Sequence, residues 1–188
     1  MKLQFRSAHS PKERSPTPAE RADYLAYLQR LQIGDNAAWE LFLNEWSPYL
    51  YNYVRTNLRG ADEVEDVLSN ILLGVVEGIR SFDGNAALST FVYSIAYRKV
   101  VDYWRQRRIT IELPEELSAA DSTDSFEIYE VLAELPEPVQ QALILRYYVG
   151  LSVSEVAIVL DRSYKATESL LSRGRHQFQN AFLERNKA

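Results

Sequence analysis

A run of basic and aromatic residues near the middle of the chain is the part best suited to nucleic-acid chemistry. Residues 98–108 hold five bases against one acid, Asp102, and Tyr97, Tyr103 and Trp104 are interleaved with them. Arginine and lysine neutralise phosphates, and aromatic rings stack on bases that have left a duplex. The run therefore predicts contact with partly single-stranded nucleic acid. The alternative is that the rings lie in a core and the charged heads reach past them to solvent.

The one acid of this run has a predicted role within the helix. Asp102 lies four residues after Arg98 and three before Arg105. These spacings place the three side chains on one side of a helix, so Asp102 could hold both arginines in position.

A second candidate contact lies toward the C-terminus and has the form of a helix-turn-helix. Ser152 and Glu155 predict a capping box at the start of a short helix, and a turn over 161–163 precedes a longer helix from Tyr164 to Leu183. Four basic side chains of the second helix can reach phosphates and base edges: Lys165, Arg173, Arg175 and His176. The alternative is a purely structural helix hairpin.

Charge is segregated along the chain. Residues 112–137 hold nine acids and no base, whereas the whole chain has a net charge of −5 and a pI of about 5.2. Outside that segment seventeen acids remain against twenty-one bases. An acidic protein binds duplex DNA weakly by itself, because phosphate neutralisation supplies most of the non-specific affinity. We therefore expect DNA binding to need a partner that covers or redirects the acidic segment.

Several classes of function are disfavoured by composition. The chain has no cysteine, and its two histidines, His9 and His176, lie far apart. There is no glycine-rich phosphate loop, no plausible Ser-His-Asp set, and no apolar run of the roughly 18 to 20 residues that span a membrane. The N-terminal residues lack a signal-peptide core. We expect a cytoplasmic protein that is not an enzyme, with no catalytic residue, no metal, no cofactor and no membrane partner.

The strongest helical pattern runs from Asp62 to Ile79. Its apolar residues follow i, i+3, i+4, i+7 spacing and are expected in the core: Val64, Val67, Leu68, Ile71, Leu72, Val75, Val76 and Ile79. The other side presents acidic and polar residues with one apolar interruption: Glu63, Asp66, Asn70, Leu73 and Glu77. This side is either a partner-binding surface or a solvated face with one stray leucine.

Caps and turn residues predict the remaining helices. A helix begins at Pro18 and ends near Gly34, and Asp35 caps the next helix. Another helical stretch begins at Ser47-Pro48. Ser89 or Thr90 caps the basic helix, which runs to about Arg108. A helix that begins at Pro136 and ends at Gly150 is expected to bury Val139, Leu143 and Tyr147.

Together these elements predict an all-α protein of two small helical domains. We divide it into a flexible arm (1–16), a first domain (17–108), an acidic flexible linker (109–125) and a helix-turn-helix domain (126–188).

Two groups of motifs resemble one protein family, the extracytoplasmic-function (ECF) sigma factors of bacterial RNA polymerase, within the sigma-70 family. The first group resembles sigma region 2: Glu65-Asp66-Val67-Leu68, Phe82-Asp83-Gly84, Thr90-Phe91-Val92-Tyr93-Ser94-Ile95-Ala96 and Asp102-Tyr103-Trp104-Arg105. The second resembles region 4: Leu135-Pro136, Leu145-Arg146-Tyr147-Tyr148-Val149-Gly150-Leu151-Ser152, Glu155-Val156-Ala157 and Ser169-Leu170-Leu171-Ser172-Arg173-Gly174-Arg175.

The resemblance implies an alternative sigma factor that binds core RNA polymerase and directs promoter-specific initiation. The β′ coiled coil of polymerase would contact Glu65, Asp66, Asn70 and Leu73. The minus-ten element would be melted and held, with a base flipped out, by Asp83, Gly84, Asn85, Ala86, Tyr97, Arg98, Arg105 and Arg108. The minus-thirty-five element would be read by Ser163, Tyr164, Lys165, Thr167, Glu168, Arg173 and Arg175. Further expected partners are the β flap and an anti-sigma factor, and the acidic linker would follow the RNA path of polymerase.

Two alternatives remain open at the level of sequence. One is a sigma mimic that sequesters regulators without binding DNA, which the small number of bases on the helix from Tyr164 favours. The other is a conventional helix-turn-helix regulator that binds a duplex operator without polymerase.

Overall fold

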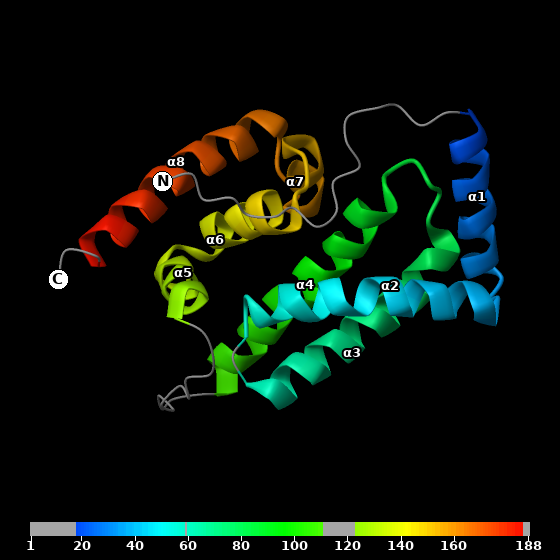
Figure 1. Cartoon of the computed structure of the whole chain (residues 1–188), viewed down its shortest axis with the longest axis horizontal. Coiled ribbons are helices and arrows are strands. Elements are labelled where there is room, and N and C mark those ends of the chain that lie inside the picture. The colour runs from blue at the N-terminus through cyan, green and yellow to red at the C-terminus, as the bar shows by residue number, and fades with distance from the viewer. Residues whose placement is uncertain (1–17, 59, 111–122, 186–188) are drawn as a thin grey trace. The chain divides into compact units, whose positions relative to one another are not determined.

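The computed structural model describes residues 18–58, 60–110 and 123–185, and every regular element in these ranges is a helix (Figure 1). The chain divides into two compact units, one containing α1 to α4 and the other α5 to α8. The prediction of an all-α fold with two helical domains is confirmed. The predicted arm over 1–16 and most of the predicted linker lie outside the described residues.

The first unit is a bundle built around three packed helices. Its elements are α1 (Pro18–Gln32), α2 (Asn36–Arg55), α3 (Ala61–Gly78), the 3-10 turn η1 (Ile79–Ser81) and α4 (Leu88–Thr110). Phe42 and Tyr53 of α2, Ile71 of α3 and Val92 of α4 are fully buried. Burial of such large apolar side chains is the main favourable term that holds α2, α3 and α4 together.

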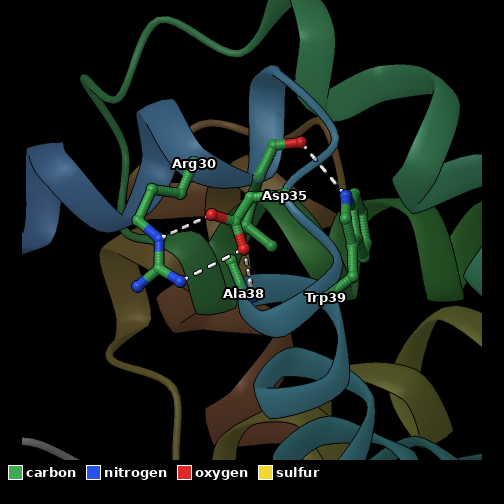
Figure 2. Close-up of polar contacts among 5 residues, drawn as sticks. Arg30, Asp35, Ala38 and Trp39 are labelled. Carbon is green, nitrogen blue, oxygen red and sulfur yellow. Dashed lines mark hydrogen bonds and ion pairs between the residues drawn. The ribbon is translucent and has the colours of Figure 1, made fainter.

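The turn between α1 and α2 has the caps that the sequence predicts (Figure 2). Gly34 has a φ of 80°, which a glycine adopts without strain, and it ends α1. Asp35 Oδ1 accepts a hydrogen bond of 2.9 Å from the backbone N–H of Ala38, and the Arg30 guanidinium donates to the same carboxylate. Trp39 Nε1 donates to the carbonyl of Leu31 at 3.1 Å. These bonds join the end of α1 to the first turn of α2.

Two predicted helix boundaries in this unit are wrong. The expected new start at Ser47-Pro48 does not exist, because α2 continues through Pro48. Proline removes one backbone hydrogen bond, but Trp46 and Leu50 on either side of it are buried, and their packing keeps the helix continuous. The basic helix α4 begins at Leu88, so Ser89 and Thr90 lie inside its first turn and do not cap it.

Five of the eight apolar residues predicted for the core of the α3 stripe are buried. Val64, Val67, Ile71 and Val75 are buried, as is Ile79 in η1. Leu68 and Leu72 are half-buried, but Val76 is 38% exposed. Val76 lies at the edge of the stripe, where the arc covered by neighbouring helices ends, so its assignment to the core was wrong.

Helices α3 and α4 approach closely because α3 carries two glycines where they meet. A Cβ added to Gly74 would lie 2.9 Å from Ile95 Cγ2, and one added to Gly78 would lie 3.0 Å from Phe91 Cζ. Figure 1 shows the two helices side by side. The absence of side chains at these positions lets α4 pack directly on the backbone of α3.

The second unit ends in a helix-turn-helix. Its elements are α5 (Thr123–Glu134), α6 (Glu137–Leu143), the π-helical turn η2 (Ile144–Val149), α7 (Val153–Val159) and α8 (Tyr164–Arg185). Pro136 precedes α6 and Gly150, with a φ of 90°, ends η2, as predicted. The π turn was not predicted. Val139 and Leu143 are buried, but Tyr147 is only half-buried, which corrects its assignment to the core.

Candidate nucleic-acid and partner interfaces

One side of α3 forms a continuous exposed surface, which we call the α3 face. All eight of its residues are exposed: Asp62, Glu65, Asp66, Ser69, Asn70, Leu73, Val76 and Glu77. Leu73 is 61% exposed, and the same helix side carries four carboxylates, of which that of Glu77 lies one turn from Leu73. The surface therefore combines negative charge with two apolar side chains, which suits a basic partner that also offers an apolar contact. The sequence pattern had assigned Val76 to the core and so missed it here.

Glu63 does not belong to the α3 face. Its carboxylate accepts a hydrogen bond from Arg107 Nη1 of α4 and forms an ion pair with it. Arg107 also donates to the Tyr103 hydroxyl at 2.8 Å, and its guanidinium lies 5.9 Å from the centre of the Trp104 ring. Only 24% of the Arg107 side chain is exposed. Arg107 is therefore part of the packing between α3 and α4.

One row of residues on the basic helix forms a second surface, the α4 face. It consists of Ser94, Tyr97, Arg98, Val101 and Arg105, all of which are half-buried or exposed. Positions 94, 98, 101 and 105 follow helical i, i+4, i+7 spacing, so their side chains lie in a row. Because they are arginines, Arg98 and Arg105 give the row two positive charges.

Both arginines of the α4 face have a defined partner. Arg105 forms an ion pair with Asp102 at 3.2 Å, as predicted. The prediction that Asp102 also holds Arg98 fails, because Arg98 Nε donates to the carbonyl of Ser94 at 3.0 Å. Tyr93 lies in the core, where its ring is 5.5 Å from that of Tyr53. The alternative of rings in a core therefore holds for Tyr93, whereas Tyr97 is half-buried at the surface. The side chain of Arg108 lies outside the described residues.

The loop between η1 and α4 packs against α1. Gln32 Nε2 donates to the carbonyls of Ile79 at 3.2 Å and Phe82 at 2.8 Å. The Phe82 ring stacks on Phe91 with centroids 4.5 Å apart. A Cβ on Gly84 would lie 3.2 Å from Leu28 Cδ1, so the loop backbone rests against α1.

Polar groups at the tip of this loop are held by each other. Asp83 Oδ1 accepts from the backbone N–H of Asn85 at 2.9 Å, and Asp83 Oδ2 accepts from Asn85 Nδ2 at 2.7 Å. The bonds from Asn85, backbone first, lower the pKa of Asp83 below its ordinary value. Asp83 and Asn85 are exposed, whereas Gly84 and Ala86 are half-buried.

Helix α8 presents most, but not all, of the residues predicted to read DNA. Tyr164, Lys165, Glu168, Arg173 and Arg175 are exposed, as is Ser163 before the helix. Thr167 is 0% exposed and its hydroxyl donates to the carbonyl of Ser163 at 3.1 Å. Its assignment as a DNA contact is corrected, because it lies on the side of α8 that packs on the rest of the unit. Two further exposed residues, Ser169 and Ser172, lie on the same helix side as Lys165 and were not named in the prediction, although helical spacing from Lys165 would place them there.

The first turns of both helices in the helix-turn-helix are capped as predicted. Ser152 Oγ accepts from the backbone N–H of Glu155 at 3.3 Å, and the Glu155 carboxylate accepts from Ser152 N at 2.8 Å. Ser163 Oγ accepts from the backbone N–H of Ala166 at 3.3 Å. At its other end, α8 is tied to α5 by an ion pair between Arg185 and Glu130 at 2.9 Å. Helix α8 is therefore fixed at its first turn by the Ser163 cap and at its last turn by the ion pair with α5.

Comparison with known families assigns both units. Residues 42–109 match the family model of sigma-70 region 2, and residues 125–177 match that of sigma-70, region 4. The chain belongs to the sigma-70 family. Within that family it is an ECF-type alternative sigma factor, which directs transcription initiation. The prediction from the sequence motifs is confirmed.

Curated relatives match about four-fifths of this sigma factor. It is 24% identical to the RNA polymerase sigma-H factor of Pseudomonas aeruginosa over 176 residues, covering 82% of this chain and 91% of that protein. It is also 24% identical to the ECF RNA polymerase sigma-E factor of Escherichia coli over 175 residues, covering 81% of this chain and 91% of that protein.

Solved structures of low sequence identity share the fold of this sigma factor. CnrH in complex with the cytosolic domain of CnrY has a TM-score of 0.67 at 19% identity, covering 82% of this chain and 94% of that one. The sigma factor RpoE of Bartonella quintana, in complex with the anti-sigma factor NepR, also has a TM-score of 0.67 at 19% identity. The match covers 76% of this chain and 95% of that one. None of the described helices of this chain is both long and apolar enough to cross a membrane.

Proposed function

We propose that the α3 face binds core RNA polymerase at the β′ coiled coil. Glu65, Asp66, Asn70 and Leu73 would make this contact, with Val76 beside them. The supporting observation is the exposure of Leu73 at 61% on a helix side that carries four carboxylates. A basic partner that also offers an apolar contact would pair with these carboxylates and cover both Leu73 and Val76.

The α4 face and the loop before it would hold the melted minus-ten element. Arg98 and Arg105 supply the charge for the phosphates, and half-buried Tyr97, one residue before Arg98, offers a ring on which a base can stack. Asp83, Gly84, Asn85 and Ala86 would form the rim that receives a flipped base, since Asp83 and Asn85 are exposed at the tip of a loop anchored on α1. Because α4 packs on α3, polymerase binding and minus-ten binding involve one rigid unit.

The exposed side of α8 would enter the major groove at the minus-thirty-five element, with Ser163, Tyr164, Lys165, Glu168, Arg173 and Arg175 as contacts. In this proposal residues 17–108 and 126–188 act as the two promoter-binding domains, the second resting on the β flap. Residues 109–125 join them along the RNA path of polymerase. The net charge of −5 supports this proposal, because an acidic chain binds DNA weakly by itself. Polymerase would then supply most of the affinity for DNA.

An anti-sigma factor would cover the α3 face and so compete with polymerase. The similar sigma factor RpoE was solved in complex with the anti-sigma factor NepR, and we extend that class of partner to the present chain. The measurement is competition: excess core polymerase should displace a bound anti-sigma factor, and Asp66→Arg should weaken both complexes. Equal binding of the anti-sigma factor to Asp66→Arg and to the wild type would place it elsewhere.

Reconstitution tests the function as a whole. The full chain with core polymerase is expected to give a run-off transcript from promoters selected out of a random library, and to crosslink to both promoter elements. Asp66→Arg should abolish core binding, because it puts a positive charge in the centre of the α3 face. Glu40→Arg, the same charge change at an exposed site of α2, should bind core polymerase normally.

The outcomes also separate the rival functions. Core binding without any promoter crosslink would indicate a sigma mimic. Tight binding of the free chain to a duplex at physiological salt would indicate a conventional helix-turn-helix regulator.

A further inference from the structure

One acid lies in the middle of the exposed side of α8. Over the first four turns, the arc of this side that contains Glu168 holds exposed residues that are otherwise basic, hydroxyl-bearing or aromatic: Tyr164, Lys165, Glu168, Ser169, Ser172, Arg175 and His176. Glu168 follows Lys165 by three residues and precedes Arg175 by seven, so the three side chains lie on one side of the helix. A carboxylate in this position would repel a phosphate backbone, so a base edge is the favourable contact for it.

We propose that Glu168 selects a cytosine in the minus-thirty-five element. This inference depends on the proposed function, which places α8 in the major groove. An ionised carboxylate only accepts hydrogen bonds, so it needs a donor at the groove floor. Cytosine presents its N4 amino group there, whereas the amino group of adenine lies beside the N7 acceptor, which repels a carboxylate. Guanine presents two acceptors and is rejected most strongly.

The surroundings of Glu168 support a reading role. Lys165 and Arg175 can contact phosphates on either side and so offset the repulsion between the carboxylate and the backbone. The first turn of α8 is held by the bonds from Thr167 Oγ1 to the Ser163 carbonyl at 3.1 Å and from Ala166 N to Ser163 Oγ at 3.3 Å. Glu168 directly follows this turn, so its backbone is already ordered before DNA binds. An ordered backbone loses less conformational entropy on binding and keeps the carboxylate in one position, which favours selection of one base.

Selection from a library randomised over the minus-thirty-five element tests the proposal, using holoenzyme reconstituted from the full chain and core polymerase. The wild type should enrich cytosine at one position. Glu168→Gln should shift that position toward adenine, because glutamine pairs bidentately with adenine N6 and N7. The ratio of cytosine to adenine there should change by roughly tenfold to a hundredfold, the usual discrimination of one base contact.

A matched control uses the same substitution on the same helix. Glu184→Gln, at an exposed site in the last turn of α8, should leave every base preference unchanged. Equal binding of the Gln variants to core polymerase and equal helix content by circular dichroism confirm that the comparison is between folded proteins.

Two results would overturn the proposal. Identical base preferences for wild type and Glu168→Gln would show that the carboxylate contacts no base. A uniform gain in affinity across all sequences would show that it acts only as a repulsive charge. A wild-type holoenzyme that selects no minus-thirty-five element would instead contradict the proposed function, and the inference would fall with it.

Discussion

Glu63 at the start of α3 and Arg107 near the end of α4 form an ion pair that joins the helices carrying the two candidate faces of the first unit. The pair lies forty-four residues apart in sequence and is partly buried. It divides the basic residues of α4 into two kinds. Arg107 packs against α3, Tyr103 and Trp104, whereas Arg98 and Arg105 remain exposed on the α4 face.

A double-mutant cycle should detect this pair as a coupling between α3 and α4. Glu63→Gln and Arg107→Gln are each expected to lower the free energy of unfolding by about 1 kcal/mol, since the pair is only partly shielded from solvent. The double variant should cost about 0.5–1 kcal/mol less than the two single changes together. Urea unfolding provides the measurement, and strict additivity would show that the two side chains do not interact in solution.

The salt dependence of promoter binding should separate the two kinds of arginine. Arg105→Gln is expected to reduce the slope of log affinity against log salt concentration by about one, because one phosphate contact is lost. Arg107→Gln should leave the slope unchanged, since its guanidinium is bound to Glu63 and Tyr103. Filter binding of the holoenzyme between low and physiological salt gives both slopes. A reduced slope for Arg107→Gln would assign that residue to DNA.

Gly174 of α8 should not tolerate a side chain. An added Cβ would lie 2.7 Å from Val139 Cγ1 and 3.5 Å from Leu143 Cγ, so α6 and α8 would have to separate. Gly174→Ala is therefore expected to destabilise the second unit by about 1–3 kcal/mol, although alanine is the better helix former by about 1 kcal/mol. The same change to alanine at exposed Gln177 should be nearly neutral. Thermal unfolding of both variants decides whether the close contact exists.

The cap at the start of α2 should be sensitive to acid. The hydrogen bond from Arg30, followed by that from the Ala38 N–H, lowers the pKa of Asp35 below its ordinary value of 3.8. The ionised carboxylate therefore stabilises the fold above that value, and its contribution is lost as pH falls through the lower folded-state pKa. Asp35→Asn should lower Tm at pH 7, and the difference from the wild type should shrink in this acid range. Asp23→Asn, an exposed site on α1, is the control; a pH-independent difference for Asp35→Asn would exclude the charged cap.

Thr167 should affect stability and not promoter choice. Thr167→Val keeps the shape of the side chain but removes the hydroxyl that donates to the Ser163 carbonyl, so a loss of about 1 kcal/mol is expected. Lys165→Ala, two residues earlier and exposed, should instead weaken minus-thirty-five binding with little change in Tm. Paired unfolding and promoter-binding measurements test this, and altered base preference in Thr167→Val would restore it as a DNA contact.

Local signals in the sequence were sufficient to predict several helix ends and the family. The Asp35 cap, the capping box of Ser152 and Glu155, and the glycines that end α1 and η2 act over a few residues, so the residues that specify them are adjacent in the chain. The spacing of apolar residues in α3 likewise predicted the side on which Leu73 is exposed, because helical periodicity does not depend on the neighbours.

Only the tertiary structure decided what each functional side chain touches. The sequence pattern alone could not show that Glu63 leaves the acidic side to bind Arg107, that Thr167 is buried, or that α2 continues through Pro48. Each of these depends on segments far apart in the chain that meet only after folding, and on how much apolar surface they bury there. Periodicity gives the direction in which a side chain points, whereas its burial and its partners depend on which other helix packs against that side.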